Sequence, residues 1–218
     1  MSITSEKKSS NEKSESDLKS CTDVEEMANL SKTLVSSLTI ANRGTGAGGS
    51  NTNKTGLSYE VLTDLSTNYI VSDKGDYWKY IRFRDQQPRD FVTFPKKSGL
   101  MKYMKQVSPD LDINGMHGTK QPDECYLDED ECKLIIIEKK FQQTTGSVVE
   151  KLQTCDAKKW QYSRLFPDYK VFYVYCLSEW FKDNAKAELE YLDYKKVPYF
   201  WGNEENYKTK MINFISSI

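Results

Sequence analysis

Two carboxylates and a lysine near the middle of the chain have the residue types and spacing of a hydrolytic metal site. Asp123 follows Pro122, and Glu138 and Lys140 stand at the end of the apolar run Leu134–Ile137. Mg²⁺ is bound by carboxylate oxygens and keeps several of its waters, and the ion can lower the pKa of one of those waters. We therefore assign Asp123 and Glu138 as metal ligands. Lys140 is placed to orient the attacking water or to stabilise the oxygens of a phosphodiester.

A β-hairpin would bring these three groups onto one face of a sheet. A four-residue turn at 128–131 places Asp123 opposite Ile136. Side chains on one face of a strand recur every two residues, so Asp123, Glu138 and Lys140 share a face, with the two carboxylates as diagonal neighbours. A bulge would reverse this assignment. The alternative is that these are ordinary charges at a strand end, although charges that close a buried strand need partners.

Glu60 and the glycine-rich segment before it are candidates for additional roles. Glu60 lies on a helix predicted over Leu57–Tyr69 and could add a third carboxylate to the metal site, or it could be a solvated helix residue. Five glycines in the segment 42–56 predict a loop without regular structure. This loop could follow a nucleic-acid backbone through its amides, Arg43 and Lys54, or it could be a flexible linker.

A polar run follows the strand that ends at Lys140. Gln142 and Gln143 could pair with adenine in the major groove. Ser147 could bind phosphate, or it could cap the helix that we expect to begin there. Lys151, Lys158 and Lys159 project from that helix and could meet phosphate or form its solvated face.

The elements expected around the hairpin form a mixed sheet with helices on both faces. Helices are predicted over about 22–40, 57–69, 98–107 and 147–166, with one or two after residue 177 and one at the C-terminus, because apolar residues recur there at helical spacing. Leu57, Val61 and Leu65 form the expected apolar stripe of the second helix. Strands are predicted two or three times within 70–95, and at 121–126, 133–140, 170–177 and 198–201.

The overall composition fits one globular domain behind a polar tail. Residues 1–22 have almost no apolar side chains and are expected to be a disordered tail, and residues 23–218 are expected to form a single domain. Mean hydropathy is −0.70, no segment is apolar enough to span a membrane, and no signal-peptide core is present. Five cysteines without a tight framework and a single histidine favour a reducing, cytoplasmic environment and argue against structural zinc. The net charge of −1 neither supports nor excludes a nucleic-acid partner.

The sequence resembles the PD-(D/E)xK nuclease superfamily, and within it the type II restriction endonucleases of a group found in bacteria and in large algal viruses. The resemblance covers roughly 42–201. It is carried by Lys-Gln-Pro-Asp-Glu at 120–124, Ile-Ile-Glu-Lys-Lys-Phe-Gln at 136–142, Gly-Ser-Val-Val-Glu-Lys-Leu-Gln-Thr at 146–154, the loop and helix at 46–60, and the strand and helix start at 173–181.

This resemblance implies a restriction-endonuclease-like α/β fold, with a mixed β-sheet core flanked by helices. It implies Mg²⁺-dependent hydrolysis of double-stranded DNA at a short palindrome by a homodimer, with Mn²⁺ as an alternative ion. A DNA methyltransferase is expected in the same system but not as a stable subunit. Metal binding falls on Asp123 and Glu138, the lysine role on Lys140 and a supporting role on Glu60. The residues expected to contact DNA are Arg43, Asn51, Asn53, Lys54, Lys120, Gln142, Gln143, Ser147 and Lys151.

Two other functions fit the same residues. A structure-specific repair or junction nuclease of the same fold would cut branched or mismatched DNA without a fixed sequence. A non-catalytic DNA-binding or protein-interaction module would keep its biological activity in a Glu138→Ala variant. Discrete plasmid fragments that vanish in EDTA and in an Asp123→Ala variant would distinguish the restriction endonuclease from both.

Overall fold

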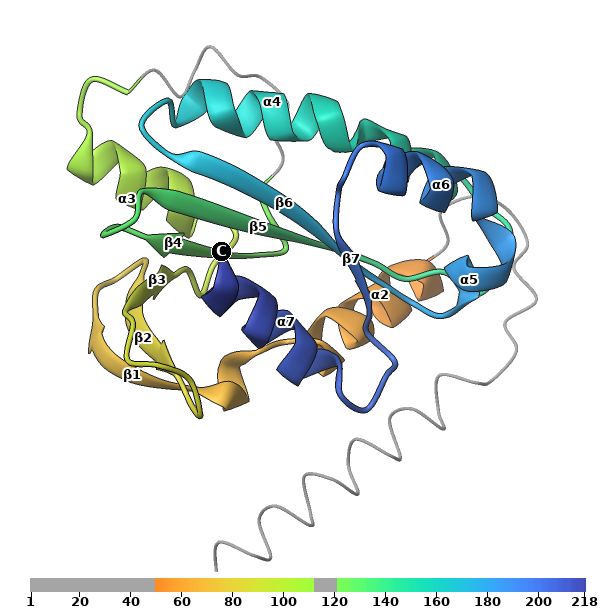
Figure 1. Cartoon of the computed structure of the whole chain (residues 1–218), viewed down its shortest axis with the longest axis horizontal. Coiled ribbons are helices and arrows are strands. Elements are labelled where there is room, and N and C mark those ends of the chain that lie inside the picture. Colours follow the sequence, from red (N-terminus) through yellow and green to blue (C-terminus); the bar gives the residue numbers. More distant parts are fainter. Residues whose placement is uncertain (1–49, 112–120) are drawn as a thin grey trace, which may run out of the picture. The chain divides into compact units, whose positions relative to one another are not determined.

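The computed structural model describes residues 50–111 and 121–218, and it describes side chains from residue 56 onward (Figure 1). The predicted tail at 1–22, the helix predicted at 22–40, Arg43 and Lys120 lie outside the described residues. The predictions for those positions therefore stay predictions.

A seven-stranded mixed sheet organises the described residues, in the order β1-β2-β3-β4-β5-β6-β7. Neighbouring strands are antiparallel from β1 to β5, and β5–β6 and β6–β7 are parallel. The strands are β1 Tyr69–Lys74, β2 Lys79–Phe83, β3 Phe91–Thr93, β4 Glu124–Asp128, β5 Lys133–Lys140, β6 Lys170–Leu177 and β7 Tyr199–Trp201. The predicted mixed α/β architecture is confirmed at this level, and the strand predicted at 170–177 coincides with β6.

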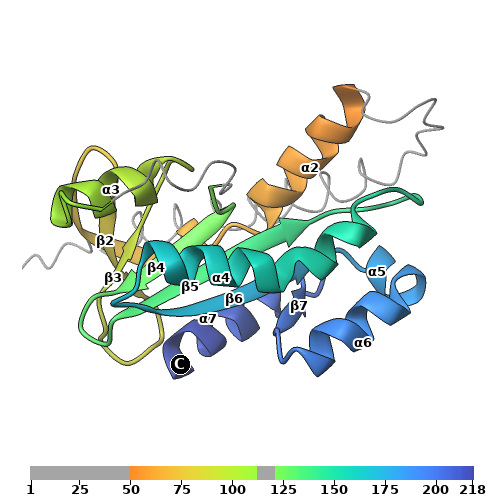
Figure 2. The same cartoon turned by 90° about the horizontal axis from the view of Figure 1, so that it is seen from above.

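Helices cover both faces of this sheet. They are α2 Ser50–Leu62, η1 Ser66–Asn68, α3 Gly99–Val107, η2 Val149–Thr154, α4 Cys155–Leu165, α5 Trp180–Asn184, α6 Lys186–Tyr194 and α7 Tyr207–Ser217. Along β5, Leu134 and Ile136 belong to a core shared with α3, η2, α4 and α6, whereas Ile135 and Ile137 belong to a core shared with α2 and α7. In Figure 1, α4 and α7 accordingly lie on opposite sides of β5 and β6, and the same arrangement is seen from above in Figure 2.

The β4–β5 hairpin differs from the predicted register by one residue on each strand. Its ladder pairs Asp128 with Lys133 and Glu124 with Ile137, so the four-residue turn covers 129–132 and not 128–131. The physical reason is Asp128, which is fully buried because it pairs with Arg89 and accepts the Glu131 amide at 2.9 Å. An aspartate held in this way belongs to the strand, and the turn begins after it.

The first described helix begins earlier than predicted and faces another way. Helix α2 starts at Ser50, so the predicted loop over 42–56 is wrong for its last seven residues. The predicted stripe is also wrong: Leu57 and Val61 are 62% and 65% exposed, and Leu65 lies beyond the helix end. Tyr59 and Thr63 face the sheet instead, and both are buried.

The segment predicted as one helix over 147–166 consists of two elements. A 3₁₀ helix, η2, precedes α4, and three of the apolar residues that recur at helical spacing there, Leu152, Cys155 and Tyr162, are buried. Ser147 is exposed and does not cap either helix, because Val148 and Thr154 occupy the two N-cap positions. The helical spacing of the buried residues therefore agrees with the prediction, whereas the predicted helix type and the predicted start are wrong.

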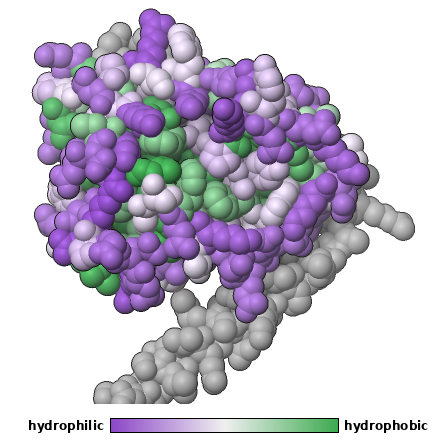
Figure 3. Space-filling view, viewed as in Figure 1, coloured by the Kyte–Doolittle hydropathy of each residue, from purple (hydrophilic) through white to green (hydrophobic). Residues whose placement is uncertain are grey.

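Strand β1 stands first in the strand order and exposes most of its side chains. Ile70 and Val71 are 49% and 46% exposed. The pairing of β1 with β2 shifts between Val71 and Asp73, so Ser72 has no register partner. Figure 3 shows one face of the molecule, on which hydrophobic side chains gather in the middle and hydrophilic ones surround them.

Two findings bear on the chemical environment of the described residues. Cys125, Cys132, Cys155 and Cys176 are all free thiols. Across 50–111 and 121–218, no helix combines the length and the apolar character needed to cross a membrane.

Candidate active site

Asp123 and Glu138 meet on one face of the hairpin, as the alternation of strand residues predicted. The β4–β5 ladder, extended by one residue beyond Glu124, places Asp123 directly opposite Glu138 and not diagonal to it. The amide of Lys139 donates a hydrogen bond of 2.9 Å to Asp123 Oδ2. The two carboxylate side chains are only 13% and 12% exposed, so each needs a positive partner.

The ammonium group of Lys140 lies among three oxygen atoms. It donates to Glu138 Oε1 and to the main-chain oxygen of Lys139 at 3.3 Å, and its Nζ lies 3.7 Å from Asp123 Oδ2. Two carboxylates and a carbonyl therefore surround one cation. The predicted association of Asp123, Glu138 and Lys140 is confirmed as a geometric fact.

A second lysine, Lys97, joins the cluster from a part of the chain that the sequence did not indicate. Its Nζ lies 2.9 Å from Asp123 Oδ1 and 3.1 Å from Glu60 Oε2. Glu60 thus reaches the cluster through Lys97. Partial burial lowers the pKa of Lys97, but the hydrogen bonds and charges of Asp123 and Glu60 outweigh that effect and raise the pKa above its ordinary value. Lys97 is therefore a cation at neutral pH.

The turn that carries Lys97 is packed too closely to shift as a unit. It joins β3 to α3, and the Gly99 amide donates to Lys96 O at 2.7 Å. A Cβ atom at Gly99 would lie 2.5 Å from the main-chain oxygen of Tyr77. The backbone of this turn is therefore held against the segment before β2, which fixes the point from which the Lys97 side chain extends.

The cluster opens into a pocket of about 650 Å³, which we call the hairpin pocket. Its walls are Lys97, Gln121, Asp123, Glu138, Lys140, Lys151, Thr154, Lys158, Tyr173 and Tyr175. The Tyr175 hydroxyl donates to Lys151 O at 3.2 Å and to Leu152 O at 3.3 Å. This contact anchors η2 to β6 and so places Lys151 at the pocket. The walls thus carry two carboxylates and four lysines.

The two tyrosines of the pocket are neutral hydrogen-bonding groups. Burial raises the pKa of Tyr173 far above its ordinary value, and the charge of Glu138 adds to the effect. Burial also raises the pKa of Tyr175, helped by Cys155 and Glu138. Both phenols are therefore protonated near neutral pH.

A buried ion pair supports the hairpin from its opposite face. Lys139 Nζ lies 2.7 Å from Glu124 Oε2, with side chains 2% and 9% exposed. Lys139 also donates to the main-chain oxygen of Glu60 at 3.1 Å, and Glu124 accepts from the Tyr126 hydroxyl. Lys139 therefore holds Asp123 through its amide on one face and α2 through its ammonium on the other.

Three of the predicted DNA-contact residues whose side chains the structure describes lie away from the pocket. Gln142 caps its own loop by donating to Thr144 O, Gln143 and Ser147 are exposed on the same loop, and none of the three lines the pocket. Asn51, Asn53 and Lys54 lie on α2 and not in a loop, and their side chains lie outside the described part. Among the four members of the predicted set whose side chains the structure describes, Lys151 alone lines the pocket.

The carboxylate side chains are not arranged to coordinate a metal ion in this structure. Across 50–111 and 121–218, no three acidic, histidine or cysteine side chains are grouped closely enough to hold an ion. The ammonium groups of Lys97 and Lys140 lie between the carboxylates and account for this spacing. The negative charge of the carboxylates is thus compensated by these two ammonium groups.

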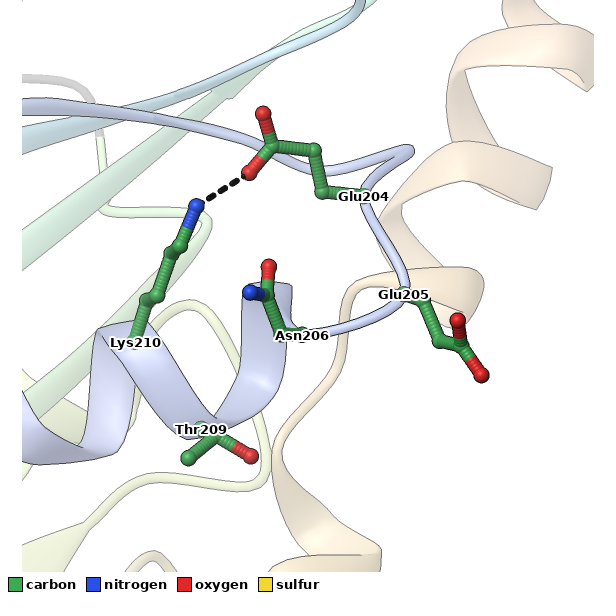
Figure 4. Close-up of a pocket in the computed structure, with 5 residues that line it drawn as sticks. All are labelled: Glu204, Glu205, Asn206, Thr209 and Lys210. Atoms are coloured by element: carbon green, nitrogen blue, oxygen red, sulfur yellow. Dashed lines mark hydrogen bonds and ion pairs between the residues drawn. The ribbon is translucent and has the colours of Figure 1, made fainter.

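A second pocket, of about 500 Å³, lies at the start of α7 (Figure 4). Lys210 pairs with Glu204 at 2.6 Å across it, whereas Glu205 points away from that pair. The Glu204 carboxylate is paired with both Lys210 and Lys182, so the hairpin pocket is the stronger candidate.

Comparison of the chain with protein-family models, with curated proteins and with solved structures gave no match. The interpretation of the hairpin pocket therefore depends on its residues and on the resemblance of its motifs.

Proposed function

We propose that the protein is a Mg²⁺-dependent endonuclease of the PD-(D/E)xK type, with the restriction-endonuclease-like version of the mixed sheet. The observation that carries this proposal is the set of three oxygens around the Lys140 ammonium: Asp123 Oδ2, Glu138 Oε1 and the Lys139 carbonyl. Such a set of hard oxygen atoms, placed around a positive charge, has the chemistry of a Mg²⁺ site.

These oxygen atoms are suitable ligands for a divalent ion, which would replace part of the positive charge that the lysines supply. Asp123 and Glu138 would hold the ion, with the Lys139 carbonyl beside them and Glu60 in support. When bound, the ion would supply a water of lowered pKa and would offset negative charge on a phosphate. The low exposure of both carboxylates favours this role, since screening by solvent is weak there.

The lysines account for binding and orientation of a phosphodiester. Lys140 donates hydrogen bonds at the point where a phosphate would approach Glu138, and a donor fixed there stabilises charge as it develops. Lys151 and Lys158 also line the pocket and would neutralise neighbouring phosphates. Carboxylates for an ion and lysines for a polyanion, in one pocket, are the charged groups that a nuclease needs.

The substrate and assembly follow from the resemblance. Double-stranded DNA with a short palindromic site is the proposed substrate, and a homodimer is the proposed form, because a two-fold symmetric protein matches a two-fold symmetric site. A DNA methyltransferase with the same recognition sequence is the expected companion in the system.

A plasmid-cleavage assay with Mg²⁺ tests the proposal. The wild-type protein should give discrete fragments, and EDTA should abolish them. Asp123→Asn, Glu138→Gln and Lys140→Met should each lower the rate by about 100-fold or more, the scale for loss of one electrostatic group in an active site. Asp130→Asn is the matched control, since Asp130 is an exposed acid in the turn of the same hairpin.

Two results would contradict the proposal. Failure to cut any unmodified DNA with Mg²⁺ or Mn²⁺ would refute catalysis. Cleavage confined to branched or mismatched DNA would retain the metal site but replace the palindrome with DNA shape, as in a junction nuclease.

A further inference from the structure

Lys97 differs from Lys140 in how firmly it is held. The Lys140 side chain is 16% exposed and lies among three oxygens, whereas the Lys97 side chain is 48% exposed and contacts the two carboxylates Asp123 and Glu60 from the solvent side. Its backbone is fixed by the packing at Gly99. Lys97 can therefore leave the carboxylates by side-chain rotation alone, and its ammonium would remain in the hairpin pocket that it lines.

We propose that Lys97 is a displaceable internal cation, which competes with a divalent metal ion for Asp123 and Glu60 and turns to the DNA phosphate when the ion binds. This inference depends on the proposed metal-dependent function. Three carboxylates against two ammoniums leave one negative charge uncompensated in the ion-free cluster. A bound divalent ion would change the net charge of the cluster from −1 to +1. Lys97, whose Nζ lies 2.9 Å from Asp123 Oδ1, is the more exposed of the two lysines and so the easier to displace.

Metal binding and DNA binding should then reinforce each other. An ion that releases Lys97 makes one more ammonium available to a phosphate, and a phosphate that captures Lys97 makes Asp123 more available to the ion. Such coupling is reciprocal by thermodynamic necessity. Lys97 is thus a positioning residue that occupies the metal-binding carboxylate of Asp123 in the absence of DNA. Glu60 is its second ion-pair partner.

Titration calorimetry with Mg²⁺ alone, in the absence of DNA, tests this role. The full chain is compared with Lys97→Met, Lys97→Arg, Asp123→Asn and the matched control Lys96→Met, which removes an exposed neighbouring charge. Lys97→Met should bind Mg²⁺ about 3- to 10-fold more tightly, the scale expected for removing one partly exposed competing charge. Lys97→Arg and Lys96→Met should stay within about 2-fold of the wild type, and Asp123→Asn should lose the site.

Thermal unfolding gives a second readout that needs no activity. In EDTA, Lys97→Met leaves the carboxylates less compensated and should melt below the wild type, and Mg²⁺ should raise its melting temperature more than it raises that of the wild type. Lys97→Gln serves as a second variant should Lys97→Met fold poorly, with the same expected pattern.

The outcomes separate the two proposals. Mg²⁺ binding that depends on Asp123 but is equal or weaker in Lys97→Met would overturn the role of Lys97 and leave the metal site intact. Absence of Asp123-dependent Mg²⁺ binding in the wild type would overturn both. Tighter Mg²⁺ binding in Lys97→Met, together with DNA binding in Mg²⁺ that is weaker than in Lys96→Met, would establish the exchange.

Discussion

Replacement of Lys139 by methionine tests the buried support beneath the candidate site. Methionine keeps the apolar length of the side chain but removes the ammonium that pairs with Glu124 at 2.7 Å and with Glu60 O at 3.1 Å. The backbone amide that holds Asp123 is unchanged by the substitution. The perturbation therefore separates the structural role of this residue from the chemistry on the other face.

The expected loss of stability is large because the charge left behind is buried. Removing one partner of a buried ion pair typically costs about 3–5 kcal/mol. Glu124 would keep the Tyr126 hydroxyl and a long contact of 3.4 Å from the Leu65 amide, so we expect the lower end, about 3 kcal/mol. The double variant Glu124→Gln/Lys139→Met leaves no unpaired charge and should recover most of that loss.

Equilibrium unfolding in urea at pH 7 measures both effects, because the single and the double variant differ in whether a buried charge is left without its partner.

A cost of about 1 kcal/mol or less for Lys139→Met at pH 7 would refute the reasoning. So would a double variant as unstable as the single one, because that result would assign the loss to packing and not to charge.

Two further predictions concern packing and acid stability. Gly202→Ala should cost about 2–3 kcal/mol in urea unfolding, because its Cβ would lie 2.7 Å from Cys176 Sγ and closer still to a buried tyrosine hydroxyl; Gly56→Ala, on α2 with nothing within 4 Å, should instead be neutral or stabilise by up to about 1 kcal/mol. The hydrogen bond from Lys195 lowers the pKa of Asp156, so its contribution is fully present above the unfolded value near pH 3.9 and is lost as the pH falls through the folded value. Asp156→Asn should therefore lose less stability between pH 5 and pH 3 than the wild type does, and an equal loss in both proteins would contradict this assignment.

The faces of the hairpin could be predicted from the sequence even though its register could not. Moving the turn by one residue shifts both strands, and because strand residues alternate with a period of two, Asp123 stays on the same face as Glu138 and Lys140. The turn itself depended on the burial of Asp128, which comes from Arg89 at a distance in sequence. Tertiary pairing of that kind leaves no local pattern.

Lys97 and α2 are two features that sequence patterns did not predict. Lys97 lies 26 residues before Asp123, on a turn without any periodicity, and its place follows from the packing of Gly99. In α2, one glycine and several small polar residues indicated a loop, yet Tyr59 fits against the sheet and Lys139 holds the Glu60 carbonyl. These tertiary contacts outweigh the weak helix propensity of the segment.

The irregularity at Ser72 has a consequence for how the protein behaves at high concentration. An outermost strand with free amide and carbonyl groups can pair with a strand from a second molecule. The exposed side chains of Ile70 and Val71 would add apolar contacts to such a pairing. A residue without a partner bends and twists the strand, while Asp73 and Lys74 place charge along it. We therefore expect the irregular edge to disfavour the edge-to-edge addition of a second molecule.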